Sequence, residues 1–406
     1  MNRAGEMASG ERVNRGQVAL LSLCWGLATT GSVIVVSVSA LVGYALAPDK
    51  ALATLPAALM WLSTAAVTLP ASFLMRRIGR RGGFMIGALI GALGAAIAAF
   101  AVYASDFALL CLGVALIGAY NGFNYYFRFA ATEATPVAFH SRAISLVLAG
   151  GVVSAFMGPA LARWGAGLVP PYLYIGPFVV IVGLAAAIFI AVSFLRIPAP
   201  AVPALRGGRP LAGIVCEPAF IVAASGAVVA YGIMILLMTI SPLAMVACDL
   251  AFEDATFVIQ WHVLGMFAPS FVSGHLIRRF GVLNVMIAGG LLLLACIAVA
   301  VSGVALGNFW VALTLLGVGW NFLFVGATTL LTQTHTPAER AKTQGLNEFM
   351  VYGVAGVCSF LSGSLHYHLG WTMLNLTAIA PVLAVLGATL WLARRRHAAC
   401  RASAAE

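Results

Sequence analysis

Long apolar stretches, separated by short polar ones, follow one another along the whole chain. Each is at least about 20 residues long, which a helix needs to cross the hydrocarbon core of a bilayer. The stretches are continuously apolar and lack the alternation of a membrane β-strand, so the pattern predicts an all-α membrane protein. Twelve transmembrane helices are expected, at 18–46, 51–75, 82–104, 107–131, 141–162, 171–195, 213–246, 255–277, 282–304, 308–333, 343–366 and 371–393.

The stretch 197–212 interrupts this pattern, because it is rich in proline and glycine, which oppose a regular helix. Six expected spans precede it and six follow. We therefore expect a six-helix bundle at 1–196, a cytoplasmic linker at 197–212 and a second six-helix bundle at 213–406.

The two halves resemble each other when the first is shifted by about 200 residues, which indicates an internal repeat and two pseudo-symmetric bundles. Four features coincide. They are Arg76-Arg77-Ile78-Gly79 with Arg278-Arg279-Phe280-Gly281, Gly118-Ala119-Tyr120-Asn121 with Val318-Gly319-Trp320-Asn321, Thr132 with Thr332, and Thr135-Pro136 with Thr336-Pro337.

Composition supports a membrane location, since 62% of residues are hydrophobic and only 8% are charged, against about a quarter in soluble domains. The net charge of +10 could suggest nucleic acid, but its placement indicates topology instead. With the N-terminus inside, only Lys50 and Arg163 of the 22 basic residues fall outside. Positive loops stay cytoplasmic, so both termini are expected in the cytoplasm of a bacterial cell.

Several classes of protein are disfavoured by what the spans contain. The seven cysteines lie mostly within expected spans and show no metal-ligand spacing, so neither a disulfide framework nor a metal site is expected, and no cofactor is implied. Paired acids or a histidine–acid set in facing spans would indicate a membrane enzyme. None is visible, and the protein is expected not to be an enzyme.

The loop between spans 2 and 3 resembles that of the major facilitator superfamily, whose motif is Gly-x-x-x-Asp-Arg-x-Gly-Arg-Arg/Lys. Arg77, Gly79, Arg80 and Arg81 match it, whereas Arg76 replaces the aspartate. With the repeat and the topology, the resemblance covers essentially the whole chain. It implies a fold of two bundles that rock about a central site.

In that family this loop helps to latch the two bundles. The resemblance therefore implies a gating role for Arg76, Arg77, Gly79, Arg80, Arg278, Arg279 and Glu348. Because the motif's acid is missing, Glu348 is expected to face Arg76 or Arg77, with Glu133 and Glu339 as alternatives within each half. The other reading of Glu348 is a hydrogen bond to neighbours at the membrane edge.

Spans 1, 4, 7 and 10 line the cavity in that family, so their polar residues are candidates for substrate binding. These are Thr29 in span 1 (which also carries Trp25 and Ser32), Asn121, Asn124, Tyr125 and Arg128 in span 4, Tyr231 in span 7, and Trp320 and Asn321 in span 10. Amides are costly in hydrocarbon, so these faces should point inward, to substrate or to another helix. For Arg128, pairing with Glu133 or reaching the cytoplasm is the alternative.

His262 in span 8 is a candidate proton carrier, because an imidazole titrates near neutral pH; a satisfied polar residue in a bundle is the alternative. The middles of spans 1, 4, 7 and 10 contain no Asp or Glu. The coupling mode therefore stays open between a proton and facilitated diffusion.

These observations together predict a secondary transporter of the inner membrane that moves a small organic solute by alternating access. The expected partners are the solute, the lipid bilayer and a coupling proton, without nucleic acid, and the protein is expected to be monomeric. Residues 125–131 and 319–326 resemble a bacterial subgroup that includes riboflavin importers. Facilitated uptake of such a planar metabolite, drug efflux and a non-transporting sensor on the same fold are the alternatives.

Overall fold

The computed structural model describes residues 15–136, 140–197, 208–336 and 339–403, and within these ranges every regular element is a helix. The chain divides into two compact units, one of Met1–Pro48 with Leu55–Pro203 and one of Asp49–Thr54 with Ala204–Glu406. The division between residues 203 and 204 falls within the expected linker, of which 198–207 lie outside the described residues.

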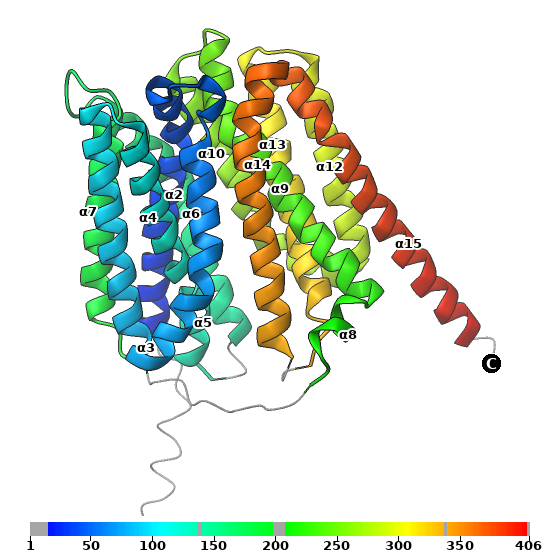
Figure 1. Cartoon of the computed structure of the whole chain (residues 1–406). Coiled ribbons are helices and arrows are strands. Elements are labelled where there is room, and N and C mark those ends of the chain that lie inside the picture. The colour runs from blue at the N-terminus through cyan, green and yellow to red at the C-terminus, as the bar shows by residue number, and fades with distance from the viewer. Residues whose placement is uncertain (1–14, 137–139, 198–207, 337–338, 404–406) are drawn as a thin grey trace, which may run out of the picture. The chain divides into compact units, whose positions relative to one another are not determined.

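The first unit is a bundle of helices (Figure 1), and its apolar side chains are found both in its interior and on its surface. Its interior contains large buried side chains such as Leu21, Phe84 and Phe127, whereas Leu89, Leu93 and Phe100 are more than half exposed. Such a surface suits lipid rather than water. The helices are α2 Arg15–Leu46, α3 Leu55–Ala104, α4 Phe107–Asn124, α5 Phe127–Glu133, α6 His140–Ala166 and α7 Ile175–Ser193.

The second unit is also helical, and α13 lies at its centre, where it packs on α9, α10 and α12. Helix α14 packs on α9, and α15 packs on α9 and α12. The elements are the 3-10 helix η1 Lys50–Leu52, α8 Leu211–Val215, α9 Pro218–Ala247, α10 Phe252–Phe267, α11 Ser270–Phe280, α12 Val282–Ser302, α13 Leu306–Leu331, α14 Arg340–Thr377 and α15 Ile379–Ser403.

Among the described residues, ten helices are long and apolar enough to cross a membrane, or eleven if the bent pair α10–α11 counts as one span. One of the ten, Lys342–Arg396, has 55 residues and contains Gly370 in a non-helical conformation. At 1.5 Å per residue it is about 80 Å long, enough for two crossings of an about 30 Å core. The helical membrane fold is confirmed, and twelve crossings stay the expected number.

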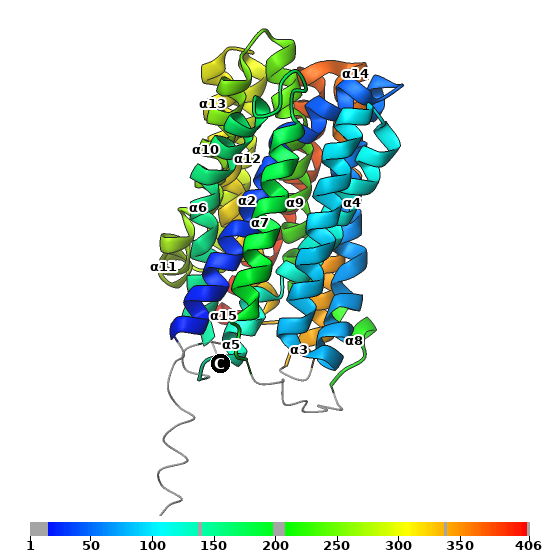
Figure 2. The same ribbon diagram turned by 90° about the vertical axis from the view of Figure 1, so that its left-hand side faces the viewer.

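The span predicted at 107–131 is found as one candidate span, Phe107–Glu133. It contains a short turn at Tyr125–Tyr126 between α4 and α5, where both residues keep helical backbone angles. One other span that the sequence predicted as continuous is interrupted. The span 255–277 breaks before Ser270, where α10 and α11 meet at a bend of 41°; both helices are labelled in Figure 2. Pro269 lies in this break, where it provides no backbone N–H.

The repeated loop motif has the same backbone conformation in both units. Gly79 has φ 82° and ψ 164°, and Gly281 has φ 86° and ψ 151°. This region is accessible almost only to glycine, and each residue ends one helix and begins the next. The glycine of the motif is therefore required by the turn itself, in each unit separately.

Candidate functional site

A cleft in the first unit collects most of the span 1 and span 4 candidates. It has about 200 Å3 of empty space, including space open to solvent, and is lined by Trp25, Ala28, Thr29 and Ser32 of α2 and by Asn121, Asn124 and Tyr125 at the end of α4. On α2 these residues are three, four or seven positions apart, so they share one face of the helix. Tyr125 follows the last residue of α4, so the end of that helix directs it into the cleft.

Three hydrogen-bond donors of this cleft are buried without a partner among the described residues. Asn121 and Asn124 are 4% and 3% exposed and Trp25 is 6% exposed, yet Nδ2 of each asparagine and Nε1 of Trp25 have no hydrogen-bond partner among the described residues. Most buried polar atoms in proteins are hydrogen-bonded, because an unpaired one costs about 1–3 kcal/mol. Three such atoms in one cleft indicate a place for a polar ligand.

The remaining side chains of the cleft give it aromatic and hydroxyl surface. The rings of Trp25 and Tyr125 lie 5.8 Å apart between centroids and are tilted by 57°. The hydroxyl of Thr29 donates to the carbonyl of Trp25 in its own helix at 2.8 Å, and Ser32 Oγ lies 3.4 Å from Oδ1 of Asn121. Thr29 and Oδ1 of Asn121 are therefore already paired, whereas Nδ2 of Asn121 and Nδ2 of Asn124 have no partner among the described residues.

Asn321, which the repeat aligns with Asn121, is used differently. Its Nδ2 donates at 2.7 Å to the carbonyl of Met266 and at 2.7 Å to Oγ of Ser270. These acceptors lie on either side of the break between α10 and α11. The amide thus connects the two parts of the broken span, which is the helix-pairing alternative considered for this residue.

Replacing Asn321 with alanine is expected to destabilise the protein, because it removes two hydrogen bonds across the helix break and leaves the Met266 carbonyl unpaired. The expected loss is about 1–3 kcal/mol. Thermal unfolding of the purified variant in detergent measures it. The exposed Asn284, whose Nδ2 donates to the carbonyl of Phe280 at the end of α11 at 2.9 Å, provides the control substitution on the surface. An unchanged melting temperature in Asn321→Ala would contradict this role.

Tyr231 and Trp320 belong to an aromatic cluster inside the second unit. Tyr231 contacts the rings of Trp320, Phe324 and Tyr352 at centroid distances of 5.7, 5.5 and 5.5 Å, and Trp320 stacks on Phe324 at 5.0 Å. Nε1 of Trp320 is buried without a hydrogen-bond partner among the described residues. A role in substrate binding stays a prediction for this cluster.

His262 is fully buried in α10, with Nδ1 2.8 Å from the carbonyl oxygen of Leu313 in α13. Nδ1 must therefore carry the hydrogen and donate it. The helices are in close contact here, since a Cβ on Gly317 would overlap the carbonyl of His262. Nδ1 is thus paired, whereas Nε2 is buried without a hydrogen-bond partner among the described residues, and proton carriage by His262 stays a prediction.

The gating candidates occupy different environments. Arg80 forms an ion pair with Glu133, with Nη2 2.6 Å from Oε1, which is the pairing within one half that the sequence suggested for Glu133. Arg77, Arg278 and Arg279 are exposed. The side chain of Arg76 lies outside the described part.

Two further candidates are not among the residues that line the cleft. Glu348 is partly buried in α14, and its pairing with an arginine of the other half stays a prediction. Arg128 lies in α5 with its guanidinium 4.9 Å from the Phe129 ring centroid. It does not line the cleft.

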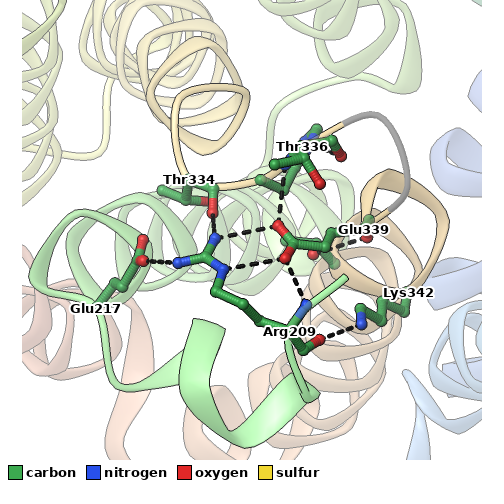
Figure 3. A network of polar contacts seen from close by, with 8 residues as sticks. Arg209, Glu217, Thr334, Thr336, Glu339 and Lys342 are labelled. Atoms are coloured by element: carbon green, nitrogen blue, oxygen red, sulfur yellow. Dashed lines mark hydrogen bonds and ion pairs between the residues drawn. The ribbon is translucent and has the colours of Figure 1, made fainter. Parts of the chain in front are cut away.

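The sequence analysis missed a second polar cluster, around Arg209 (Figure 3). The side chain of Glu339 is 2% exposed and its carboxylate accepts from the Arg209 backbone N–H at 2.7 Å, from Arg209 Nε at 3.0 Å, from Arg209 Nη2 at 3.1 Å and from the Thr336 N–H at 3.0 Å. These donors hold the pKa of Glu339 well below its usual range. Hydrogen bonds to Glu339 and, to a smaller extent, to Glu217 raise the pKa of Arg209.

Comparison with known proteins identifies the family. The riboflavin transporter RfnT of Brucella anthropi is 41% identical over 379 residues, 92% of this chain and 94% of the relative. The MFS-type transporter YdeG of Bacillus subtilis is 30% identical over 377 residues, 86% and 85% of the two chains. The crystal structure of the nucleoside transporter NupG superposes with a TM-score of 0.70 at 15% identity, over 91% of this chain and 99% of that one. No family model matches the chain.

The chain therefore belongs to the major facilitator superfamily. Its function is the transport of a small molecule across a membrane, and the family, the helical fold and the transport function expected from the sequence are confirmed.

Proposed function

We propose that this protein carries riboflavin across the bacterial inner membrane. The observation that carries the proposal is the 41% identity with a riboflavin transporter over nearly the whole of both chains. The cleft of the first unit adds chemical support. Riboflavin combines a planar aromatic ring with a polar pyrimidine edge, and the cleft combines aromatic rings with unpaired amides.

In this proposal the two halves rock so that the bound substrate is exposed first to one side of the membrane and then to the other, which is alternating access. The first unit binds the substrate through Asn121, Asn124 and Trp25. Both termini face the cytoplasm, because 20 of the 22 basic residues then lie on that side.

Uptake of radiolabelled riboflavin into proteoliposomes tests the proposal. We expect saturable uptake that exceeds the uptake of protein-free liposomes and is reduced by excess unlabelled riboflavin. A protein that binds riboflavin but does not move it would favour the sensor. A protein that binds and moves a planar drug but not riboflavin would favour drug efflux, and either result would overturn riboflavin transport.

Proton coupling through His262 is a separate prediction. If His262 carries the proton, an inward-directed pH gradient stimulates riboflavin uptake by the wild-type protein, and the His262→Gln variant, whose amide can still donate to the Leu313 carbonyl, loses that stimulation. If uptake does not respond to the pH gradient in either protein, His262 does not carry a coupling proton, and facilitated diffusion is favoured.

A further inference from the structure

We propose that the cleft of the first unit binds the pyrimidine edge of the flavin ring, and that Asn121, Asn124 and Trp25 thereby determine substrate specificity. This inference rests on the proposed function, since it names the part of riboflavin that the same cleft would recognise. It concerns the ring edge that carries two carbonyl groups and one N–H, in the order acceptor, donor, acceptor.

The size of the cleft limits what it can hold. The cleft has only about 200 Å3 of empty space, and this space includes open solvent, so a whole riboflavin molecule does not fit inside it. It therefore accommodates one part of riboflavin, either an edge of the ring or the flexible ribityl chain.

The chemistry of the cleft favours the ring. A planar carboxamide presents an acceptor and a donor side by side, so it can pair with an N–H and its neighbouring carbonyl, as asparagine pairs with the edge of adenine. The indole N–H of Trp25 can only donate, which suits the other carbonyl. The rings of Trp25 and Tyr125 offer aromatic surface to a flat ligand, where offset or edge contacts are favourable. A flexible chain of hydroxyl groups would use this flat arrangement poorly.

Binding of ring analogues separates these possibilities. Lumiflavin has the ring without the ribityl chain, 3-methyllumiflavin has the pyrimidine N–H blocked, and ribitol has no ring. Competition with riboflavin is followed by the quenching of flavin fluorescence in detergent. We expect lumiflavin to compete, 3-methyllumiflavin to bind at least about tenfold more weakly because a paired donor is lost, and ribitol not to compete. In Asn121→Ala the difference between the two lumiflavins should fall below about threefold.

Each outcome decides the inference. Equal binding of the two lumiflavins, or competition by ribitol alone, would overturn recognition of the pyrimidine edge while riboflavin transport could still stand. If the preference for lumiflavin over 3-methyllumiflavin is unchanged in Asn121→Ala, Asn121 does not bind the pyrimidine edge. The protein could also distinguish lumiflavin from 3-methyllumiflavin and yet not transport riboflavin. That result would support recognition of the pyrimidine edge and overturn the proposed function.

A second inference follows independently from the Arg209 cluster. We infer that Arg209 holds helix ends of the second unit together through its ion pair with Glu339, as Arg80 does in the first unit through its ion pair with Glu133. We call the Arg209–Glu339 pair the clip of the second unit. Arg80 follows the motif glycine Gly79 and pairs with Glu133. In the repeated motif Gly281 is followed by Val282, so the second unit has no arginine at that position. The structure supplies one from the linker.

The contacts of Arg209 connect three segments of the second unit (Figure 3). Its guanidinium pairs with Glu339 just before α14, donates to the carbonyl of Thr334 just after α13 at 3.0 Å, and pairs with Glu217 just before α9. Lys342 of α14 donates to the Arg209 carbonyl. Arg209 is thus bonded at once to the segments that precede α9, follow α13 and precede α14.

Hydrogen exchange of the Glu339→Gln variant tests the clip. Because the Arg209 N–H donates to the Glu339 carboxylate, weakening that acceptor should raise the exchange rate of the peptide 208–217 at least about tenfold, whereas the peptide 218–230 in α9 serves as the internal reference. The exposed Arg394 provides the control substitution Arg394→Ala. We expect the maximal transport rate to fall in Glu339→Gln at unchanged KM. Unchanged exchange at 208–217 would overturn the clip, as would acceleration throughout the chain, which would indicate a general loss of stability.

Discussion

Replacing Asn121 with alanine is expected to reduce riboflavin uptake by about 10- to 100-fold without lowering the melting temperature. Nδ2 of Asn121 has no hydrogen-bond partner among the described residues, so the folded protein loses little when the amide is removed. The substrate loses its partner in a buried cleft, at a cost of about 1–3 kcal/mol, and each 1.4 kcal/mol corresponds to about tenfold in affinity. Proteoliposome uptake and thermal unfolding measure the two effects.

The contrast with Asn321 makes this prediction specific. The two residues occupy equivalent positions of the repeat, yet Asn321→Ala is expected to affect stability first, because both of its amide hydrogens are already bonded. The exposed Asn284→Ala should change neither property. Full uptake by Asn121→Ala, at substrate concentrations below KM, would remove Asn121 from the binding site.

Gly118→Ala is expected to destabilise the first unit by about 3 kcal/mol, the upper end of the usual cost of overpacking. A Cβ on Gly118 would overlap the carbonyl oxygen of Met60 and approach its carbonyl carbon to 2.7 Å. The backbone of α3 has no flexible group that could move aside, so α3 and α4 must separate. Separation would also weaken the hydrogen bond from Thr64 Oγ1 to the Gly118 carbonyl, which is 2.9 Å long.

Gly183→Ala in α7 is the matched control, because a Cβ there meets nothing within 4 Å. Thermal unfolding in detergent should show a lower melting temperature for Gly118→Ala than for wild type. The melting temperature of Gly183→Ala should equal that of wild type. Since Gly118 lies one turn before Asn121, uptake should fall together with stability. A Gly118→Ala protein as stable as Gly183→Ala would mean that the two helices are farther apart than described.

The Arg209 cluster illustrates a limit of motif reading. The sequence analysis treated Glu339 as a partner for motif arginines of its own half, but Arg209 of the expected linker pairs with it instead. Only the proximity of two segments 130 residues apart reveals this. The only signal in the sequence was the valine that follows the motif glycine in the second copy.

The broken span 8 illustrates a second limit. Hydropathy predicts a single crossing at 255–277, since the average over a window is insensitive to one proline. Pro269 was a signal that could have been used, because it interrupts helical hydrogen bonding. The bend of 41° and the bonds from Asn321 that connect the two parts depend on α13, which is distant in sequence.

The sequence by itself determined the class of this protein, its helical membrane fold, the repeated glycine turns and the residue types of the candidate site. These properties follow from local composition and spacing, because the cost of polar groups in lipid acts on each segment separately. The tertiary structure alone decided that the amide donor of Asn121 has no partner among the described residues, whereas both amide hydrogens of Asn321 are bonded. Pairing depends on whether an acceptor from another helix lies within about 3 Å, and helices that share a sequence pattern can differ in that distance.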